Sequence, residues 1–175
     1  RPGSGHILPC RAPQPVDTAT VGHLELGSQL LQFARSARNP CREPVERHQG
    51  HSSLTINGRQ LPVVMWDDGI AWFTFKEICE SPRSASDYIQ IAEYFHTVMV
   101  SDIPVMGSLQ DDAARRFVNM IDEFYDRSVN LVVSAAAQPE ELYYGKRLAF
   151  EFERTASRLR EMQSHEYMAR EHLHD

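Results

Sequence analysis

The sequence predicts an α/β fold, chiefly because a strand–helix–strand pattern occupies its second half. Residues 97–103 and 129–134 are short runs rich in β-branched residues, and the second is apolar enough to be buried on both faces of a parallel sheet. Ser108 and Asp111 have the spacing of a capping box and mark where the intervening helix begins. Strand, helix and strand of these lengths form a βαβ unit. The apolar residues with the period of one helical face are Leu109, Ala113, Phe117, Met120, Ile121 and Phe124.

Strand signals also precede this unit. Asn57-Gly58 separates two short β-runs within residues 54–63, and this dipeptide is typical of a type I′ hairpin turn. Residues 69–75 form a third run, rich in aromatic side chains, and a helical turn follows it that should end before Pro82. We therefore expect a β-hairpin beside a mixed, largely parallel sheet.

Further helices are expected to flank this sheet. One covers residues 86–95, where Asp87 in the first turn is favourable to the helix dipole. A short helix begins at Pro139. The last helix is long, from residue 149 to residue 170. Its inward face carries Phe152, Ala156, Leu159 and Met162. The fold class is thus α/β, with a β-hairpin, a βαβ unit, flanking helices and a long C-terminal helix.

Composition excludes several classes of function. The 175 residues include 18 basic and 24 acidic side chains, and the net charge of −6 argues against a general nucleic-acid binder. The three cysteines, Cys10, Cys41 and Cys79, lack CxxC spacing, so we expect neither a disulfide framework nor a zinc site. A reducing compartment such as the cytosol fits this pattern. No apolar run approaches the roughly 20 residues of a membrane span, so no transmembrane segment is expected.

The first 52 residues differ in character from the rest. Six of the ten prolines lie there, at positions 2, 9, 13, 15, 40 and 44, and only residues 24–34 have a helical period. The segment is either a poorly ordered tail or linker, or sequence foreign to the remainder of the chain. We predict two parts: a poorly ordered or non-native segment 1–52 and an α/β domain 53–175.

Common enzyme signatures do not occur in this sequence. It contains no GxxxxGK[ST] phosphate-binding loop, no GxGxxG after a strand, no GxSxG elbow and no HExxH. Asp122 and Glu123 follow an apolar run as the acidic end of a magnesium-holding strand would, but the helical period places both on the solvent side of a helix. We predict no catalytic residue and no metal site. The histidines near the C-terminus, His165, His172 and His174, are not expected to bind a metal ion.

Two polar stripes hold the candidate binding residues. The first lies on the central helix and consists of Arg115, Asn119, Asp122 and Asp126. It is either a solvated face or a docking edge for another domain or subunit. The second consists of Arg154 and Arg158, one turn apart on the last helix. These two arginines are either part of a salt-bridged surface or a pair of guanidinium groups for a phosphate.

Five segments carry a family resemblance when they are read together. They are FTFKEIC (73–79), SASDYIQIAEYFHTVMVSDIPVM (84–106), ARRFVNMIDEFYD (114–126), VNLVVSAAAQPEELY (129–143) and FEFERTASRLREMQSHEYMAREHL (150–173). In this order they resemble the C-terminal part of the ZapE-type P-loop ATPases, an AAA-like family with bacterial cell-division and mitochondrial members. The resemblance covers residues 53–175. The family patterns ARRF and RTxSRL fall on Arg115, Arg116, Arg154, Thr155, Ser157, Arg158 and Leu159.

For an intact protein the resemblance implies binding and hydrolysis of ATP with Mg²⁺. In bacteria this activity is linked to the division ring at the inner membrane face, and in mitochondria to respiratory-chain proteins. The family's phosphate-binding loop and magnesium-holding strand lie upstream of the five segments, and nothing in residues 1–52 matches them. The chain, which starts with Arg1, is therefore expected to be a C-terminal fragment that does not hydrolyse ATP alone.

Two functions follow from these observations. The first is the C-terminal portion of a cytoplasmic ATPase, peripheral at the inner membrane face, in which Arg154 and Arg158 approach nucleotide. The residues expected to face the ATPase half, a neighbouring subunit or a division-ring protein are Arg115, Arg116, Asp122 and Asp126. The alternative is a non-enzymatic adaptor that binds a protein through the polar face of helix 108–127. A small enzyme of unknown type is a third interpretation, with no residue constellation behind it.

Overall fold

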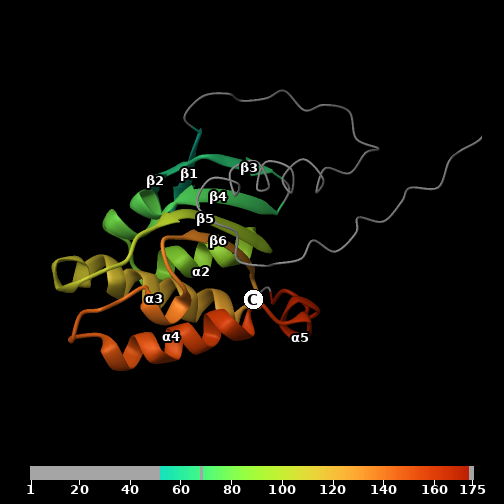
Figure 1. The fold of residues 1–175 in the computed structure, drawn as a ribbon. Coiled ribbons are helices and arrows are strands. Elements are labelled where there is room, and N and C mark those ends of the chain that lie inside the picture. Colours follow the sequence, from blue (N-terminus) through green and yellow to red (C-terminus); the bar gives the residue numbers. More distant parts are fainter. Residues whose placement is uncertain (1–51, 68, 174–175) are drawn as a thin grey trace, which may run out of the picture. The chain divides into compact units, whose positions relative to one another are not determined.

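A computed structural model describes residues 52–67 and 69–173, which form a four-stranded sheet, a β-hairpin and several helices (Figure 1). The sheet has the order β3-β4-β5-β6, and these strands are Met65–Asp67, Ile70–Thr74, Thr97–Ile103 and Asn130–Ala135. β4, β5 and β6 run parallel, and β3 runs antiparallel to β4. The predicted α/β class and βαβ unit are confirmed. A second parallel crossover, from β4 to β5, was not predicted as such.

The hairpin pairs β1 (Ser52–Ile56) with β2 (Arg59–Val63). Asn57 and Gly58 form its two-residue turn and have φ values of 47° and 73°. A type I′ turn requires such left-handed values at both positions, and asparagine and glycine adopt them most readily. The predicted hairpin is therefore confirmed. Its buried side chains, Ile56, Leu61 and Val63, belong to the main core.

Helices cover one face of the sheet. α2 (Ala85–Tyr94) and α3 (Asp111–Asp126) are the two crossover helices, and α4 (Ala149–Glu161) lies beyond α3 (Figure 1). Phe117 of α3 connects these layers, because its ring centre lies 6.1 Å from that of Phe75 and 6.0 Å from that of Phe152. Such aromatic pairs stabilise a core beyond the area that they bury.

Shorter helical segments complete the described chain. They are the π-helix η1 (Lys76–Glu80), the 3-10 helices η2 (Ser108–Gln110) and η3 (Pro139–Glu141), and the single turn α5 (His165–Met168). The helical turn before Pro82 and the short helix at Pro139 are confirmed.

The start of α3 differs from the prediction. Leu109 fits the apolar period but lies in η2 and is fully exposed, whereas the other five predicted positions are buried. The expected capping box of Ser108 and Asp111 is wrong, since Gln110 Oε1 accepts the backbone N–H of Gly107 at 2.9 Å instead. The Asp111 carboxylate binds a hydroxyl from a distant loop, which the local sequence does not reveal.

β6 is half-buried, whereas the sequence predicted that residues 129–134 are buried on both faces. The strand order places β5 between two parallel neighbours and leaves β6 at the end of the sheet. Apolar content alone does not distinguish a central strand from a terminal one, so this prediction was wrong.

The predicted long C-terminal helix is two helices. α4 ends at Glu161, and Ser164 caps α5 by accepting the Tyr167 N–H at 3.1 Å, as serine commonly does at a helix start. The Tyr167 hydroxyl then reaches the backbone carbonyl oxygens of Phe124 and Val129, each at 3.2 Å. The predicted inward face of Phe152, Ala156, Leu159 and Met162 is confirmed, since each is at most 6% exposed.

Several predictions fall outside the described residues. They are the nature of the segment before residue 52, the helical period at 24–34, and the cysteines Cys10 and Cys41. Cys79 is a buried free thiol, and burial raises its pKa, so it is not a reactive thiolate at neutral pH.

Candidate functional site

Two arginines of α4 bind one aspartate of α3. Arg154 Nη2 lies 2.5 Å from Asp122 Oδ2, and Arg158 Nη1 lies 2.6 Å from Asp122 Oδ1. Each carboxylate oxygen therefore accepts from a different guanidinium, and such charge-assisted hydrogen bonds are stronger than neutral ones. The spacing of four residues brings both arginines to the same turn of α3. Together with Asp126, these residues are named the arginine–carboxylate cluster below.

The two arginines of this cluster differ in their freedom. Arg158 also lies 3.5 Å from Asp126, and its guanidinium carbon lies 4.7 Å from the centre of the Tyr125 ring. Its side chain is 22% exposed, whereas that of Arg154 is 55% exposed. Arg154 is thus the member that a second oxyanion can reach.

The formal charges of the cluster cancel, since it contains two arginines and two aspartates. An oxyanion that bound both arginines would have to displace Asp122, but one that bound the exposed side of Arg154 would not. Partly exposed ion pairs of this kind contribute on the order of 1 kcal/mol or less to stability. The cluster can therefore join α3 to α4 and still offer one guanidinium to a ligand.

The predicted polar stripe of α3 is divided by this arrangement. Asp122 and Asp126 face α4, while Arg115 and Asn119 are exposed. Arg116 lies on a different side and donates to the backbone carbonyl of Cys79 at 2.8 Å, which ties α3 to η1. The structure thus brings Arg154, Arg158, Asp122 and Asp126 together and leaves Arg115 and Arg116 apart from them.

The acidic pair 122–123 lies within α3, as its period predicted, but the predicted position on the solvent side was wrong. Asp122 faces α4, and the two side chains are only 23% and 24% exposed. Glu123 pairs with Arg127 one turn later, with 2.9 Å between Oε2 and Nη1. Neither carboxylate therefore stands at the end of a strand, where a magnesium-holding acid would be expected.

A second polar network joins α3 to the C-terminal segment. The Tyr125 hydroxyl donates to Glu161 Oε2 at 2.7 Å, and Arg170 Nη2 lies 2.8 Å from Glu161 Oε1. The hydrogen bond from Tyr125, followed by the one from Arg170, lowers the pKa of Glu161. The Arg170 guanidinium also lies over the Tyr167 ring at 5.0 Å. Sequence reasoning missed this network because Tyr125 lies 36 residues before Glu161 along the chain.

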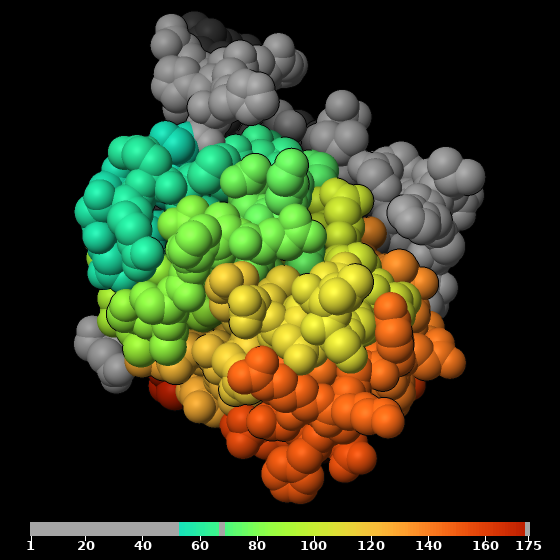
Figure 2. Space-filling model, turned by 90° about the vertical axis from the view of Figure 1, so that its left-hand side faces the viewer, coloured from blue at the N-terminus to red at the C-terminus, as the bar shows by residue number. Residues whose placement is uncertain are grey.

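The segments that follow the parallel strands pair with each other. Met106 N–H donates to the Leu142 carbonyl at 2.8 Å, and Tyr144 N–H donates to the Met106 carbonyl at 3.0 Å. Figure 2 shows the two segments, in yellow and orange, in contact. Between these two bonds, the Tyr143 hydroxyl donates to Asp111 at 2.7 Å. Burial, and then this hydrogen bond, raise the pKa of Tyr143.

Sequence reasoning also missed the end of β5. Asp102 has a φ of 63°, uncommon outside glycine, at a β-bulge in the β5–β6 pairing. Its carboxylate accepts the Ser101 hydroxyl at 3.1 Å, and that hydroxyl accepts the Trp72 indole N–H at 3.2 Å. Carboxyl ends of parallel strands are where α/β sheets usually hold ligands. A polar pair directly after the apolar residues 98–100 was the sequence signal that could have indicated this site.

The described residues offer neither a cluster of metal ligands nor a helix suited to a membrane. Within residues 52–67 and 69–173, no three or more His, Cys, Asp or Glu side chains are grouped so that they could hold a metal ion. In the same ranges, no helix combines the length and apolar character needed to cross a membrane.

Much of this chain is similar in sequence to known proteins. A family model described as AFG1-like ATPase matches residues 35–171. The chain is 46% identical over 127 residues to "Cell division protein ZapE" of Escherichia coli (strain K12), an alignment that covers 73% of this chain and 34% of that protein. It is 32% identical over 146 residues to "Lactation elevated protein 1 homolog B" of Danio rerio, which covers 65% of this chain and 29% of that protein. No solved structure shows a significant match.

The chain spans about a third of the length of the curated relatives that it matches. The family match begins at residue 35, upstream of residue 53, where the predicted resemblance begins. The family resemblance that the five segments predicted is confirmed. Because the match takes in every helix and strand that the structure describes, this chain belongs to the AFG1-like ATPase family.

Proposed function

We propose that this chain supplies the C-terminal α/β part of an AFG1-like ATPase and does not hydrolyse ATP by itself. Two observations support this proposal: the alignment covers 34% of the E. coli relative, and the sequence contains no phosphate-binding loop motif. Hydrolysis depends on groups that position the γ-phosphate and Mg²⁺ and stabilise the charge of the transition state. ATP and Mg²⁺ then belong to the remaining part of the intact protein.

The arginine–carboxylate cluster is the surface that we assign to the ATPase part or to a neighbouring subunit. The observation that carries this assignment is the 55% exposure of Arg154 while it is bound to Asp122. Arginine binds phosphate and carboxylate oxygens in a bidentate geometry, so a nucleotide phosphate or an acidic side chain fits this position. Arg115 and Arg116 of α3 lie apart from this cluster, and we assign them to a separate contact with the same partner.

A titration of this chain with a fluorescent ATP analogue and Mg²⁺, followed by a hydrolysis assay, tests the first proposal. We expect neither saturable binding nor turnover, and circular dichroism of the same sample checks that the chain is folded. Saturable binding with turnover would place a complete nucleotide site within these 175 residues and contradict the proposal.

Substitutions in an intact ATPase that contains this segment test the arginine assignment. Arg154→Ala should lower the ATPase rate about tenfold or more, since removing one donor to a transition-state oxyanion has effects of that size or larger. Arg147→Ala is the matched control, because Arg147 is exposed outside the cluster. Unchanged assembly and ATPase rate in both Arg154→Ala and Arg158→Ala would overturn the assignment.

A non-enzymatic adaptor is the second candidate, favoured by the exposure of Arg115 and Asn119 on a helix of 16 residues. Retention of purified division-ring protein by the immobilised chain tests this candidate. Loss of retention with Arg115→Glu, but not with Arg147→Glu, would support the adaptor. Equal retention by both variants would exclude the polar face of α3 as its binding surface.

The name of the E. coli relative supplies the cellular context of the proposal. That protein is called a cell division protein. We extend this role to the intact form of the present chain, acting in the cytoplasm and peripherally at the inner face of the membrane.

A further inference from the structure

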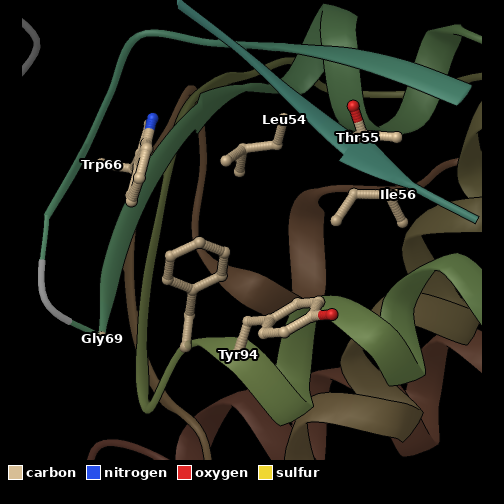
Figure 3. Close-up of a pocket in the computed structure, with 7 residues that line it drawn as sticks. Leu54, Thr55, Ile56, Trp66, Gly69 and Tyr94 are labelled. Atoms are coloured by element: carbon tan, nitrogen blue, oxygen red, sulfur yellow. The ribbon is translucent and has the colours of Figure 1, made fainter.

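An open groove lies between the hairpin and the end of α2, and it shares no residue with the arginine–carboxylate cluster (Figure 3). Its volume is about 410 Å³, and its lining includes Leu54, Thr55, Ile56, Trp66, Tyr94 and Phe95. Figure 3 shows Leu54 and Ile56 pointing from β1 toward Tyr94, with Trp66 at one side. Trp66 and Tyr94 are 53% and 61% exposed. Two large exposed aromatic residues thus border an apolar floor formed by the half-buried Leu54 and the buried Ile56 and Phe95.

The outer edge of β1 forms one wall of this groove. In a two-residue hairpin the residues that flank the turn, here Ile56 and Arg59, exchange hydrogen bonds. Hydrogen-bonded and non-hydrogen-bonded pairs then alternate, so Thr55, which lies opposite Gln60, turns its backbone N–H and C=O away from β2. Pro62 falls at the same kind of position on β2, where its missing N–H is not needed.

Among the described residues, none pairs with the outward backbone groups of β1. Within the part of the chain that the structure describes, no backbone hydrogen bond from outside the hairpin reaches Ser53 or Thr55, and their hydroxyls bind the Gln60 side chain. At the other end, Asn57 N–H donates to Gln90 Oε1 at 2.6 Å, which ties the turn to α2 and closes the groove there. The open edge therefore runs from Ser53 to Thr55, beside the apolar floor.

We propose that this groove is a docking site for an extended polypeptide segment of another protein, which adds as a strand to the outer edge of β1. The edge requires an occupant with free backbone N–H and C=O groups, and the floor requires apolar side chains at alternate positions. A compact apolar molecule would fill the floor but leave the strand edge unpaired. The inference does not depend on the ATPase proposal.

Selection of random octapeptides, displayed as a library, on the full chain tests the proposal. We expect the enriched peptides to carry apolar residues at alternate positions. Fluorescence anisotropy of the labelled peptides should show about a tenfold loss of affinity when a central residue is replaced by proline, because proline removes a strand hydrogen bond. This series requires no change in the protein.

A matched pair of variants tests the strand edge itself. Thr55→Pro removes the outward N–H of β1 without removing a hydrogen bond of the hairpin ladder, so peptide affinity should fall about tenfold. Gln60→Pro is the control, because Gln60 is the other member of this cross-strand pair and its loss disrupts the same side-chain contact. The backbone N–H that this substitution removes points to the opposite edge of the hairpin, away from the groove. Thermal melts establish that both variants are folded.

The aromatic border is tested separately. Trp66→Ala should weaken binding about tenfold or more, and Phe150→Ala, which removes an exposed aromatic ring from α4, should leave it unchanged. The proposal is overturned if no peptide is enriched, or if the proline-substituted peptides bind as well as their parents. Equal effects of Thr55→Pro and Gln60→Pro would also overturn it, since an apolar site without strand addition would then explain the binding.

Discussion

Asp87, in the first turn of α2, has a side chain with no exposed surface. Its carboxylate accepts from Arg59 at 2.7 Å, from Asn57 at 2.9 Å and from the Ser84 N–H at 2.8 Å. Burial acts to raise the pKa of this carboxyl, but the hydrogen bonds and the Arg59 charge outweigh it and hold the pKa below its ordinary value. One ionised residue thereby connects the hairpin turn to the start of α2, which begins at Ala85, one residue before its predicted position.

At this scale we predict that Asp87→Asn lowers the free energy of unfolding by about 2 kcal/mol near neutral pH, because hydrogen bonds to a charged group are lost. Since the native pKa is lowered, the stabilisation is fully present above the ordinary pKa of 3.8 and is lost as pH falls through the native value. Urea unfolding should therefore show a smaller difference between wild type and variant near pH 3 than near pH 7.

Glu93→Gln is the control for this prediction, because Glu93 is an exposed acid on the same helix. It should change the free energy of unfolding by less than about 0.5 kcal/mol. An equal loss of stability in Asp87→Asn at both pH values would show that the carboxylate charge is not the cause.

At the scale of elements, periodicity predicted what each helix buries better than where it begins or ends. Phe117 and Phe124 follow the period and are buried, but Leu109 follows it equally well and is exposed in η2. The break after α4 depends on Ser164, whose side chain caps a new helical turn. This local hydrogen bond competes with continuation of the helix, and the spacing of apolar residues does not reveal it. The terminal position of β6 depends on pairing partners far along the chain, which local composition does not carry.

The candidate site was predictable as residue types but not as an arrangement. Asp122 lies 32 residues from Arg154 and 36 from Arg158, so the sequence gives no direct sign that the three meet. The helical spacing did place both arginines on one side of α4. The side chain of Arg154 is more exposed than that of Arg158. This difference follows from the packing of α4 on α3, which the sequence alone does not show.

Tyr143 links the starts of α3 and α4, and Gly145 allows it to do so. Its hydroxyl donates to Asp111 and accepts the Leu148 N–H at 3.3 Å, while its ring stacks on Phe152 at 4.8 Å. A Cβ at Gly145 would collide with the Tyr143 hydroxyl and ring. We predict that Gly145→Ala displaces this ring and lowers the free energy of unfolding by about 2 kcal/mol, measured by urea denaturation.

Tyr143→Phe distinguishes the contribution of the tyrosine ring to stability from that of its hydroxyl group. It keeps the stacked ring and removes the hydrogen bonds, and it should lower the free energy of unfolding by about 1 kcal/mol. If Gly145→Ala were less destabilising than Tyr143→Phe, the tyrosine ring would not be displaced by the added methyl group.

At the scale of the whole described chain, one continuous core connects the sheet, the layer of α2 and α3, and α4. The two tryptophans, Trp66 and Trp72, both lie in the sheet, in β3 and β4. Tryptophan fluorescence therefore reports on the sheet, whereas far-ultraviolet circular dichroism reports mainly on the helices. A domain that unfolds in one cooperative step gives coincident transitions with both probes.

We predict that Leu159→Ala, in the layer farthest from the sheet, lowers both transitions to the same new midpoint. Leu159 is 5% exposed, and a buried leucine truncated to alanine costs about 3 kcal/mol through lost contacts and the cavity left behind. Phe150→Ala, on the exposed side of the same helix, should leave both midpoints nearly unchanged. A shift in the helical signal alone would mean that α4 unfolds separately. The ion pairs of the arginine–carboxylate cluster would then break in a first step that leaves the sheet folded.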